Sequence, residues 1–96
     1  MEDAKYSIKF TNRFKKDLKK CSKRGRDIGL LREVIDILSK KGKLPSKYRT
    51  HSLSGKYKDY LECHIQSDWL LVWIQKEKEM ILLFTNTGTH SDIFDE

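Results

Sequence analysis

Cysteine is scarce in this chain of 96 residues, which contains only Cys21 and Cys63. The two lie far apart in the sequence and form no CxxC pair, so we expect reduced, packed thiols rather than a disulfide framework. Cys63 stands next to His64. Adjacent residues of a strand point to opposite faces, so a cysteine–histidine nucleophile is not expected.

Long apolar runs are also missing. No segment reaches the roughly 20 residues that a membrane-spanning helix needs. The opening residues, MEDAKYSIKF, are charged and lack the apolar centre of a signal peptide. We therefore expect no membrane association and a cytoplasmic location. Repeats, linkers and low-complexity segments are absent too, so residues 1–96 are expected to form a single domain.

Histidine is rare, and His51, His64 and His90 all fall in the second half of the chain. An imidazole can take or give a proton near neutral pH. His64 is soon followed by Asp68 and Trp69, so the group could form a proton-transfer site on a nucleic acid. The histidines could equally be scattered surface residues. Their spacing contains no HxH or HExxH pair, so no metal site is expected.

Charge is distributed unevenly along the chain. Residues 1–49 contain 16 Lys/Arg and 6 Asp/Glu, whereas residues 50–96 contain 4 and 8, for a net charge of +6. A basic surface attracts polyanions, of which RNA and DNA are the usual ones. The alternatives are a solvated lysine-rich face and a surface matched to an acidic protein partner.

Apolar periodicity in the first half predicts a strand and a helical hairpin. Apolar and polar residues alternate over 6–10, as in a half-buried strand. Apolar residues then recur at spacings of four and three over 14–21, behind a cap at residues 11–12. A second amphipathic helix is predicted from a cap at Asp27 to its end at Gly42. The short connection between the two helices favours an antiparallel pair.

The second half predicts three strands after a connector at Leu44–Tyr57. They begin near Lys58, at Trp69 and at Met80, and their connections are too short for crossovers, so they should form an antiparallel meander. In the first of these strands, the side chain of Glu62 would point to the same face as the side chains two positions before and two positions after it. The fold class expected is α+β, in the order β-α-α-β-β-β, with the helical hairpin packed on an antiparallel sheet and a short C-terminal helix or turn.

RNA cleavage is a reaction that these residue types can perform without a cofactor. The 2′-hydroxyl attacks the adjacent phosphorus, so a general base, a general acid and a group that offsets phosphorane charge are needed. Histidines, an orienting Asp68 and nearby lysines would meet these needs. Tyr60, Trp69 or Phe94 could stack a base. Trp69 is equally a candidate core residue, and Asp68 a candidate turn residue.

Four segments match one known family: FKKDLK, YRTHSLSGKYKDY, ECHIQSDWLLV and TGTHSDIF. With them the chain resembles the YafQ-type toxins of the RelE/ParE superfamily, the toxin halves of bacterial type II toxin–antitoxin pairs. The resemblance implies a compact RelE-like fold. It also implies a cytoplasmic, metal-independent endoribonuclease that needs no cofactor and cleaves messenger RNA in the ribosomal A site.

The resemblance also implies roles for individual residues. It carries over His51, His64, Asp68 and His90 as catalytic residues, and Trp69 and Phe94 as substrate contacts. To these we add two expected substrate contacts from the residues themselves: Tyr60, which could stack a base, and Lys56, which could stabilise phosphate charge. Two positions depart from the family, because Leu61 and Asn86 stand where an arginine is common. Charge stabilisation at the phosphate would then come from lysines such as Lys56 or Lys58.

The partners implied are an acidic antitoxin of the DinJ or RelB type, the ribosome with its messenger RNA, and operator DNA only as a toxin–antitoxin complex. Two alternatives from other functional classes remain. One is a ParE-like toxin that inhibits DNA gyrase and cuts nothing. The other is a nucleic-acid-binding module that acts only with its antitoxin. The presence of all three histidines favours the nuclease.

Overall fold

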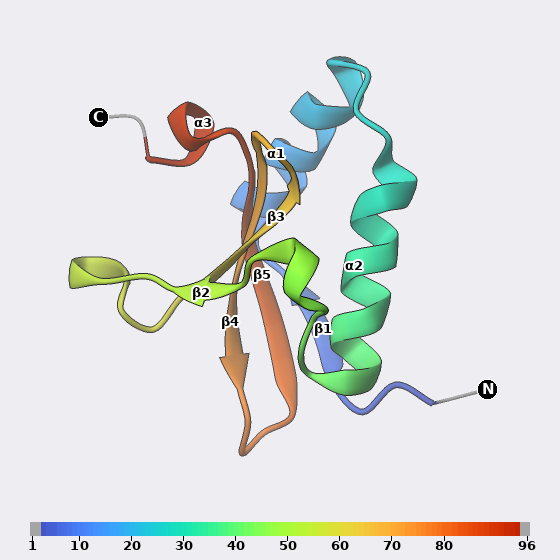
Figure 1. Ribbon diagram of the computed structural model, residues 1–96, viewed down its shortest axis with the longest axis vertical. Coiled ribbons are helices and arrows are strands. Elements are labelled where there is room, and N and C mark those ends of the chain that lie inside the picture. The colour runs from blue at the N-terminus through green and yellow to red at the C-terminus, as the bar shows by residue number, and fades with distance from the viewer. Residues whose placement is uncertain (1–2, 95–96) are drawn as a thin grey trace.

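The computed structural model describes residues 3–94, in which two helices pack on one face of a five-stranded sheet (Figure 1). The elements in chain order are β1 (Ser7–Phe10), α1 (Asn12–Lys23), α2 (Ile28–Lys41), the 3₁₀ turn η1 (Ser46–Tyr48), β2 (His51–Ser52), the 3₁₀ turn η2 (Gly55–Tyr57), β3 (Leu61–Gln66), β4 (Trp69–Lys76), β5 (Ile81–Gly88) and α3 (His90–Phe94).

Both predicted helices are present and begin at predicted caps. The Thr11 side chain accepts a hydrogen bond from the Phe14 amide, and the Asp27 side chain accepts one from the Gly29 amide. These bonds satisfy amides that have no partner inside the helix. Gly42 closes α2 with a φ of 72°, a left-handed conformation that glycine adopts without strain.

The sheet has the strand order β1-β5-β4-β3-β2. As predicted, β3, β4 and β5 form an antiparallel meander. β1 instead pairs in parallel with β5, from Ser7 opposite Ile81 to Phe10 opposite Phe84, so the sheet is mixed rather than antiparallel throughout. All four residues of β1 are exposed, Ile8 at 38% and Phe10 at 43%, so the half-buried face expected from their alternation is not found. The direction of the strand depends on the path of the chain through both helices.

β2 lies inside the segment predicted as a connector. Its two residues pair with β3, so that His51 lies opposite Glu62. A strand of two residues has no period that the sequence could reveal. The strand predicted from near Lys58 begins at Leu61, because the residues before it form the turn η2.

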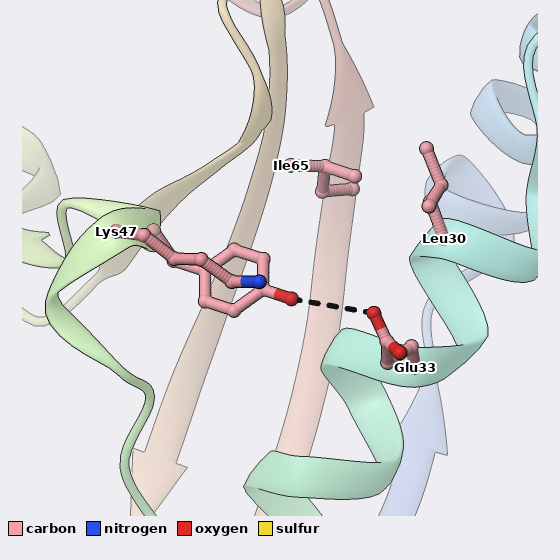
Figure 2. A pocket seen from close by; sticks show the side chains of 5 residues that line it. Leu30, Glu33, Lys47 and Ile65 are labelled. Atoms are coloured by element: carbon pink, nitrogen blue, oxygen red, sulfur yellow. Dashed lines mark hydrogen bonds between the residues drawn. The ribbon is translucent and has the colours of Figure 1, made fainter.

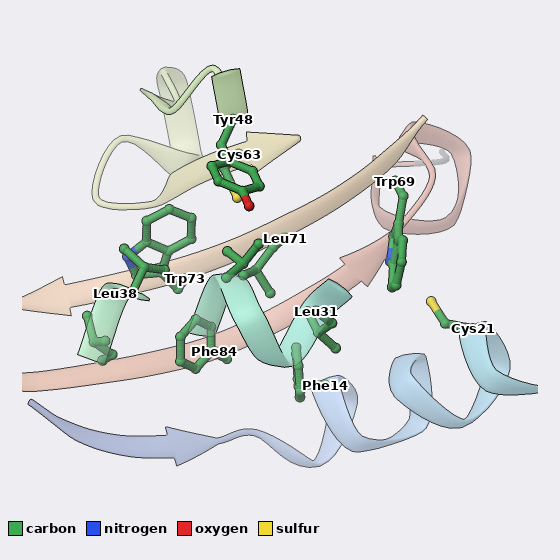
Figure 3. Close-up of a cluster of buried hydrophobic side chains, with 12 residues drawn as sticks. Phe14, Cys21, Leu31, Leu38, Tyr48, Cys63, Trp69, Leu71, Trp73 and Phe84 are labelled. Atoms are coloured by element: carbon green, nitrogen blue, oxygen red, sulfur yellow. The ribbon is translucent and has the colours of Figure 1, made fainter. Parts of the chain in front are cut away.

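The main core lies between the helices and one face of the sheet, as Figure 3 shows. Its fully buried aromatic side chains are Phe14, Trp69, Trp73 and Phe84. Cys21 and Cys63 are buried free thiols, as expected. No helix within residues 3–94 has the length and apolar character needed to cross a membrane. The single domain expected over 1–96 stays a prediction at its ends, since residues 1–2 and 95–96 lie outside the described residues.

Candidate functional site

On the β2–β3 edge of the sheet, one histidine contacts a buried carboxylate and a second histidine lies close to the first. β2 sets His51 opposite Glu62, and the His51 Nε2 atom lies 3.0 Å from Glu62 Oε1. The His51 and His64 rings are 6.3 Å apart between centroids. Leu61, Cys63 and Ile65 pack against the core, so alternation along β3 directs Glu62 and His64 to the other face.

His51, Glu62 and His64 form a histidine–carboxylate cluster. Its contacts indicate which atoms of His51 carry a hydrogen. His51 Nδ1 lies 3.1 Å from the carbonyl oxygen of Arg49, which can only accept, so Nδ1 carries a hydrogen. Nε2 meets a carboxylate oxygen, and that contact needs a proton between the two atoms. His51 and Glu62 therefore share a proton, on one partner or the other.

Glu62 is a site residue that the sequence analysis did not select. Its side chain is only 2% exposed, and a buried carboxylate is costly unless it is paired. Glu62 Oε2 and His64 Nδ1 are both buried without a hydrogen-bond partner among residues 3–94. The available signal was the position of Glu62 two residues before His64, on the same face of a predicted strand.

A second cluster joins α3 to η2 through a row of rings. The His90 and Phe94 rings are 5.9 Å apart, Phe94 and Tyr57 are 5.4 Å apart, and Tyr57 and Tyr60 are 5.6 Å apart. Lys56 Nζ lies 5.3 Å from the centre of the Tyr57 ring. The row and its lysine thus contain His90 and three other predicted site residues, Phe94, Tyr60 and Lys56. The row also contains Tyr57, which no pattern in the sequence marked as a site residue.

The sheet register relates the two clusters. His64 of β3 lies opposite Leu70 of β4, which lies opposite Gly88 of β5. The chain therefore leaves β5 in the same row as His64, and α3 begins with His90 two residues later. In Figure 1, α3 and η2 both lie on the side of the sheet away from α2. The register therefore leads the chain from the row of His64 to the start of α3, where His90 stands.

Asp68 and Trp69 do not join these clusters. Asp68 is exposed in the β3–β4 turn, and its carbonyl oxygen accepts a hydrogen bond from Arg26 Nη2 at 3.3 Å. No contact among the described residues links the Asp68 carboxylate to a histidine, so its orienting role stays a prediction. The substrate role predicted for Trp69 requires correction. Its side chain is completely buried, and Nε1 donates to Thr87 Oγ1 at 2.9 Å, so its ring has no free face for a base.

The two positions that lack the family's arginine are occupied by engaged residues. Leu61 packs against the core, and Asn86 Nδ2 lies 3.5 Å from the Asp17 carboxylate of α1. Lys56 is the cation that contacts the ring row, while Lys58 is exposed nearby in the chain.

The structure gives little support for an enclosed pocket, a metal site or a cysteine nucleophile at these residues. A hollow of about 180 Å³ between α2, η1 and β3 contains no histidine and is lined by Leu30, Glu33, Lys47, Tyr48 and Ile65 (Figure 2). No group of three or more His, Cys, Asp or Glu residues within 3–94 is arranged to hold a metal ion. Burial, and then the nearby Glu62 charge, raises the pKa of Cys63 to about 12, so this thiol is not a nucleophile at neutral pH.

Comparison with known proteins identifies relatives along nearly the whole chain. A sequence model of the family described as "Bacterial toxin of type II toxin-antitoxin system, YafQ" matches residues 6–95. The chain is 33% identical over 88 residues to the mRNA interferase toxin YafQ of Escherichia coli K12, which covers 91% of this chain and 94% of that protein. It is 30% identical to a putative toxin YafQ of Haemophilus influenzae, with 94% and 93% covered.

Solved structures agree with the fold. The E. coli DinJ–YafQ toxin–antitoxin complex contains a chain with a TM-score of 0.84 and 31% identity, covering 94% of this chain and 98% of that one. A metal-bound toxin from Helicobacter pylori gives a TM-score of 0.85 and 39% identity, with 93% and 99% covered. The predicted RelE-like α+β fold is thereby confirmed.

Proposed function

The chain belongs to the YafQ family of toxins from bacterial type II toxin–antitoxin systems, and we propose that it is an mRNA interferase, an endoribonuclease that cleaves messenger RNA. The observation that carries the proposal is the pairing of His51 with buried Glu62 beside the His64 ring, on the strand whose row leads through β4 and β5 to His90. General acid–base catalysis on RNA needs such a set of proton donors and acceptors.

His64 is the general base in this proposal. Both ring nitrogens of His51 are engaged, one by the Arg49 carbonyl and the other by Glu62, whereas His64 has no such pairing among the described residues. His64 takes the proton from the 2′-hydroxyl, whose oxygen attacks the adjacent phosphorus. The proton held between His51 and Glu62, together with Lys56, offsets the charge that grows on the phosphorane.

His90 is the general acid. As the bond between phosphorus and the 5′-oxygen breaks, His90 gives its proton to that oxygen, so one proton enters the protein and one leaves it. The products are a 2′,3′-cyclic phosphate and a free 5′-hydroxyl. Phe94 and the tyrosines of the ring row offer faces on which a base of the substrate stacks.

The ribosome supplies the substrate in this proposal. His51 and His90 are exposed and His64 is partly exposed, while the hollow in Figure 2 is lined by other residues, so the protein does not enclose a strand of RNA by itself. The A site would instead hold the message against the toxin. Purified protein should therefore cut translated messenger RNA well and naked messenger RNA poorly. Equal rates on both would contradict ribosome dependence.

The remaining partners follow from the family and the charge. The E. coli relative forms a complex with DinJ. For this chain we propose an acidic antitoxin, contact with operator DNA only as a toxin–antitoxin complex, and a cytoplasmic location.

The test of the catalytic assignment is His90→Ala. Losing the acid should lower the single-turnover rate by about 100-fold or more, since such proton transfers contribute about 10²–10⁴-fold. Mapping messenger RNA 5′ ends after induction of each protein measures the loss in cells. Ribosome affinity and melting temperature should stay near those of the parent protein. A variant that cuts at the parent rate excludes His90 as the acid. DNA damage without cleavage would favour gyrase inhibition, and no effect on growth would favour a binding module.

A further inference from the structure

α3 carries His90 and Phe94, but it is a single turn of five residues. A helix this short is not stable by itself, because one turn orders several residues for very few hydrogen bonds. Its position must therefore come from contacts with other elements. Phe94 reaches η2 through Tyr57 on one side. The contacts on the other side of the turn converge on Asp92.

Asp92 is held by three cations of α1 or its C-terminal cap. Its Oδ1 lies 3.2 Å from Lys20 Nζ, and its Oδ2 lies 2.8 Å from Arg24 Nη1. Arg13 Nη2 donates to the Asp92 carbonyl oxygen at 2.9 Å. The Asp92 side chain is only 14% exposed, so these pairs are better shielded from water than most surface ion pairs.

Asp92 also organises the start of the turn. Its Oδ2 accepts a hydrogen bond from the Thr89 amide at 3.0 Å, and its own amide donates to Thr89 Oγ1 at 3.0 Å. This reciprocal pair is a capping box, with an aspartate in the place usual for glutamate. The hydrogen bonds and nearby cations together hold the pKa of Asp92 well below its usual range, so the side chain is ionised near neutral pH.

Gly88 makes room for this arrangement. A Cβ atom added there would lie 2.9 Å from both Cβ and Oδ2 of Asp92, and the φ of 150° lies where glycine is favoured. Helical spacing puts His90 and Phe94 on one side of the turn, since they are four residues apart, and Asp92 on the opposite side. The anchored side and the presented side of α3 are therefore different.

We propose that Asp92 is a positioning residue for RNA cleavage: by tying α3 to α1 it sets where His90 and Phe94 stand relative to His64. This inference rests on the proposed function. Asp92 touches neither the substrate nor the reacting atoms, so its effect passes through the placement of His90. A displacement of a catalytic group by about 1 Å can cost about 100-fold in rate.

The test compares Asp92→Asn with Asp36→Asn. Asp36 forms a matched surface ion pair with Lys40 on α2, away from the ring row. Hydrogen exchange of the α3 amides should become faster in Asp92→Asn and stay unchanged in Asp36→Asn. In single-turnover cleavage of translated messenger RNA, Asp92→Asn should lower the maximal rate by about 100-fold with half-saturation nearly unchanged. Melting temperature should shift by only a few degrees, because α3 has no buried residue and contributes none to the main core.

A double-mutant cycle with Arg24→Met checks that the effect passes through the tie. If both residues act through one contact, the combined loss of rate should be smaller than the product of the single losses. Faster α3 exchange with an unchanged rate would overturn the positioning role, and so would unchanged exchange. Full multiplicativity would overturn the assignment to Arg24. If the parent protein cuts no RNA, the proposed function fails, while hydrogen exchange still reports whether Asp92 holds α3.

Discussion

At the scale of single residues, Glu62 is the residue on which the histidine–carboxylate cluster depends. Glu62→Gln keeps the size of the side chain but removes the carboxylate that shares a proton with His51. We expect the single-turnover rate to fall by about 100-fold, within the range of one acid–base contribution. Melting should change little, because the glutamine amide N–H can donate a hydrogen bond to His51 Nε2. Single-turnover cleavage and thermal melting by circular dichroism measure the two effects.

Glu79→Gln is the matched control, since Glu79 is an exposed glutamate of the β4–β5 turn. It should leave both the rate and the melting temperature unchanged. A Glu62→Gln protein as active as the parent would remove the carboxylate from the mechanism.

Single residues also show how much of the candidate site could be predicted from the sequence. His51 and His64 were predicted to be catalytic, and they do lie together. Trp69 carried the same motif signal, yet its ring fills the core and bonds to Thr87, a partner that lies 18 positions further along the chain. Whether an aromatic ring faces solvent or the core is decided by tertiary packing, and a local motif does not contain that information.

At the scale of elements, the long periodic segments were predictable and the short ones were not. The elements α1, α2 and the meander could be recognised in the sequence from helix caps and from the alternation of apolar residues. β2 consists of two residues, yet it is the element that brings His51 to Glu62. A segment this short is stabilised by its neighbours rather than by its own propensity, so only the assembled sheet reveals it.

The docking of α3 should have a defined dependence on pH. The folded pKa of Asp92 is lowered below the unfolded value of about 3.9. The ionised carboxylate therefore contributes its full stability above the unfolded pKa, and that contribution is lost as pH falls through the folded pKa. The difference in free energy of unfolding between parent and Asp92→Asn should be constant from neutral pH to about pH 5 and shrink below about pH 4.

Urea denaturation at a series of pH values, with equal m-values for both proteins, measures this difference. A difference that instead varied between pH 5 and 8 would show that another group, rather than Asp92, controls it.

At the scale of the whole molecule, the basic surface of α1 divides into two parts. Arg13 and Lys20 are engaged with acidic groups of the same chain, Asp17 and Asp92. Lys15, Lys16 and Lys19 are exposed. These three residues are therefore the better candidates for binding an acidic partner.

Reversing charge in Lys16→Glu/Lys19→Glu should slow association with the antitoxin by about tenfold or more at low salt, because steering by opposite charges raises association rates. Lys76→Glu/Lys78→Glu, in and beside the β4–β5 turn, changes the net charge equally and should have a much smaller effect. Stopped-flow association rates at several salt concentrations compare the two. Equal slowing by both pairs would show that only the net charge matters.

The parallel pairing of β1 with β5 affects the order in which parts of the protein fold during synthesis. Residues 7–10 are synthesised well before their strand partner, which consists of residues 81–84. β5 also connects β1 to the rest of the sheet, and α3 follows it. A growing chain can form its helical hairpin early, but pairings between distant segments come late because the intervening chain must first be ordered. The protein that a ribosome is translating thus completes its sheet, and places His90, only after β5 has been synthesised.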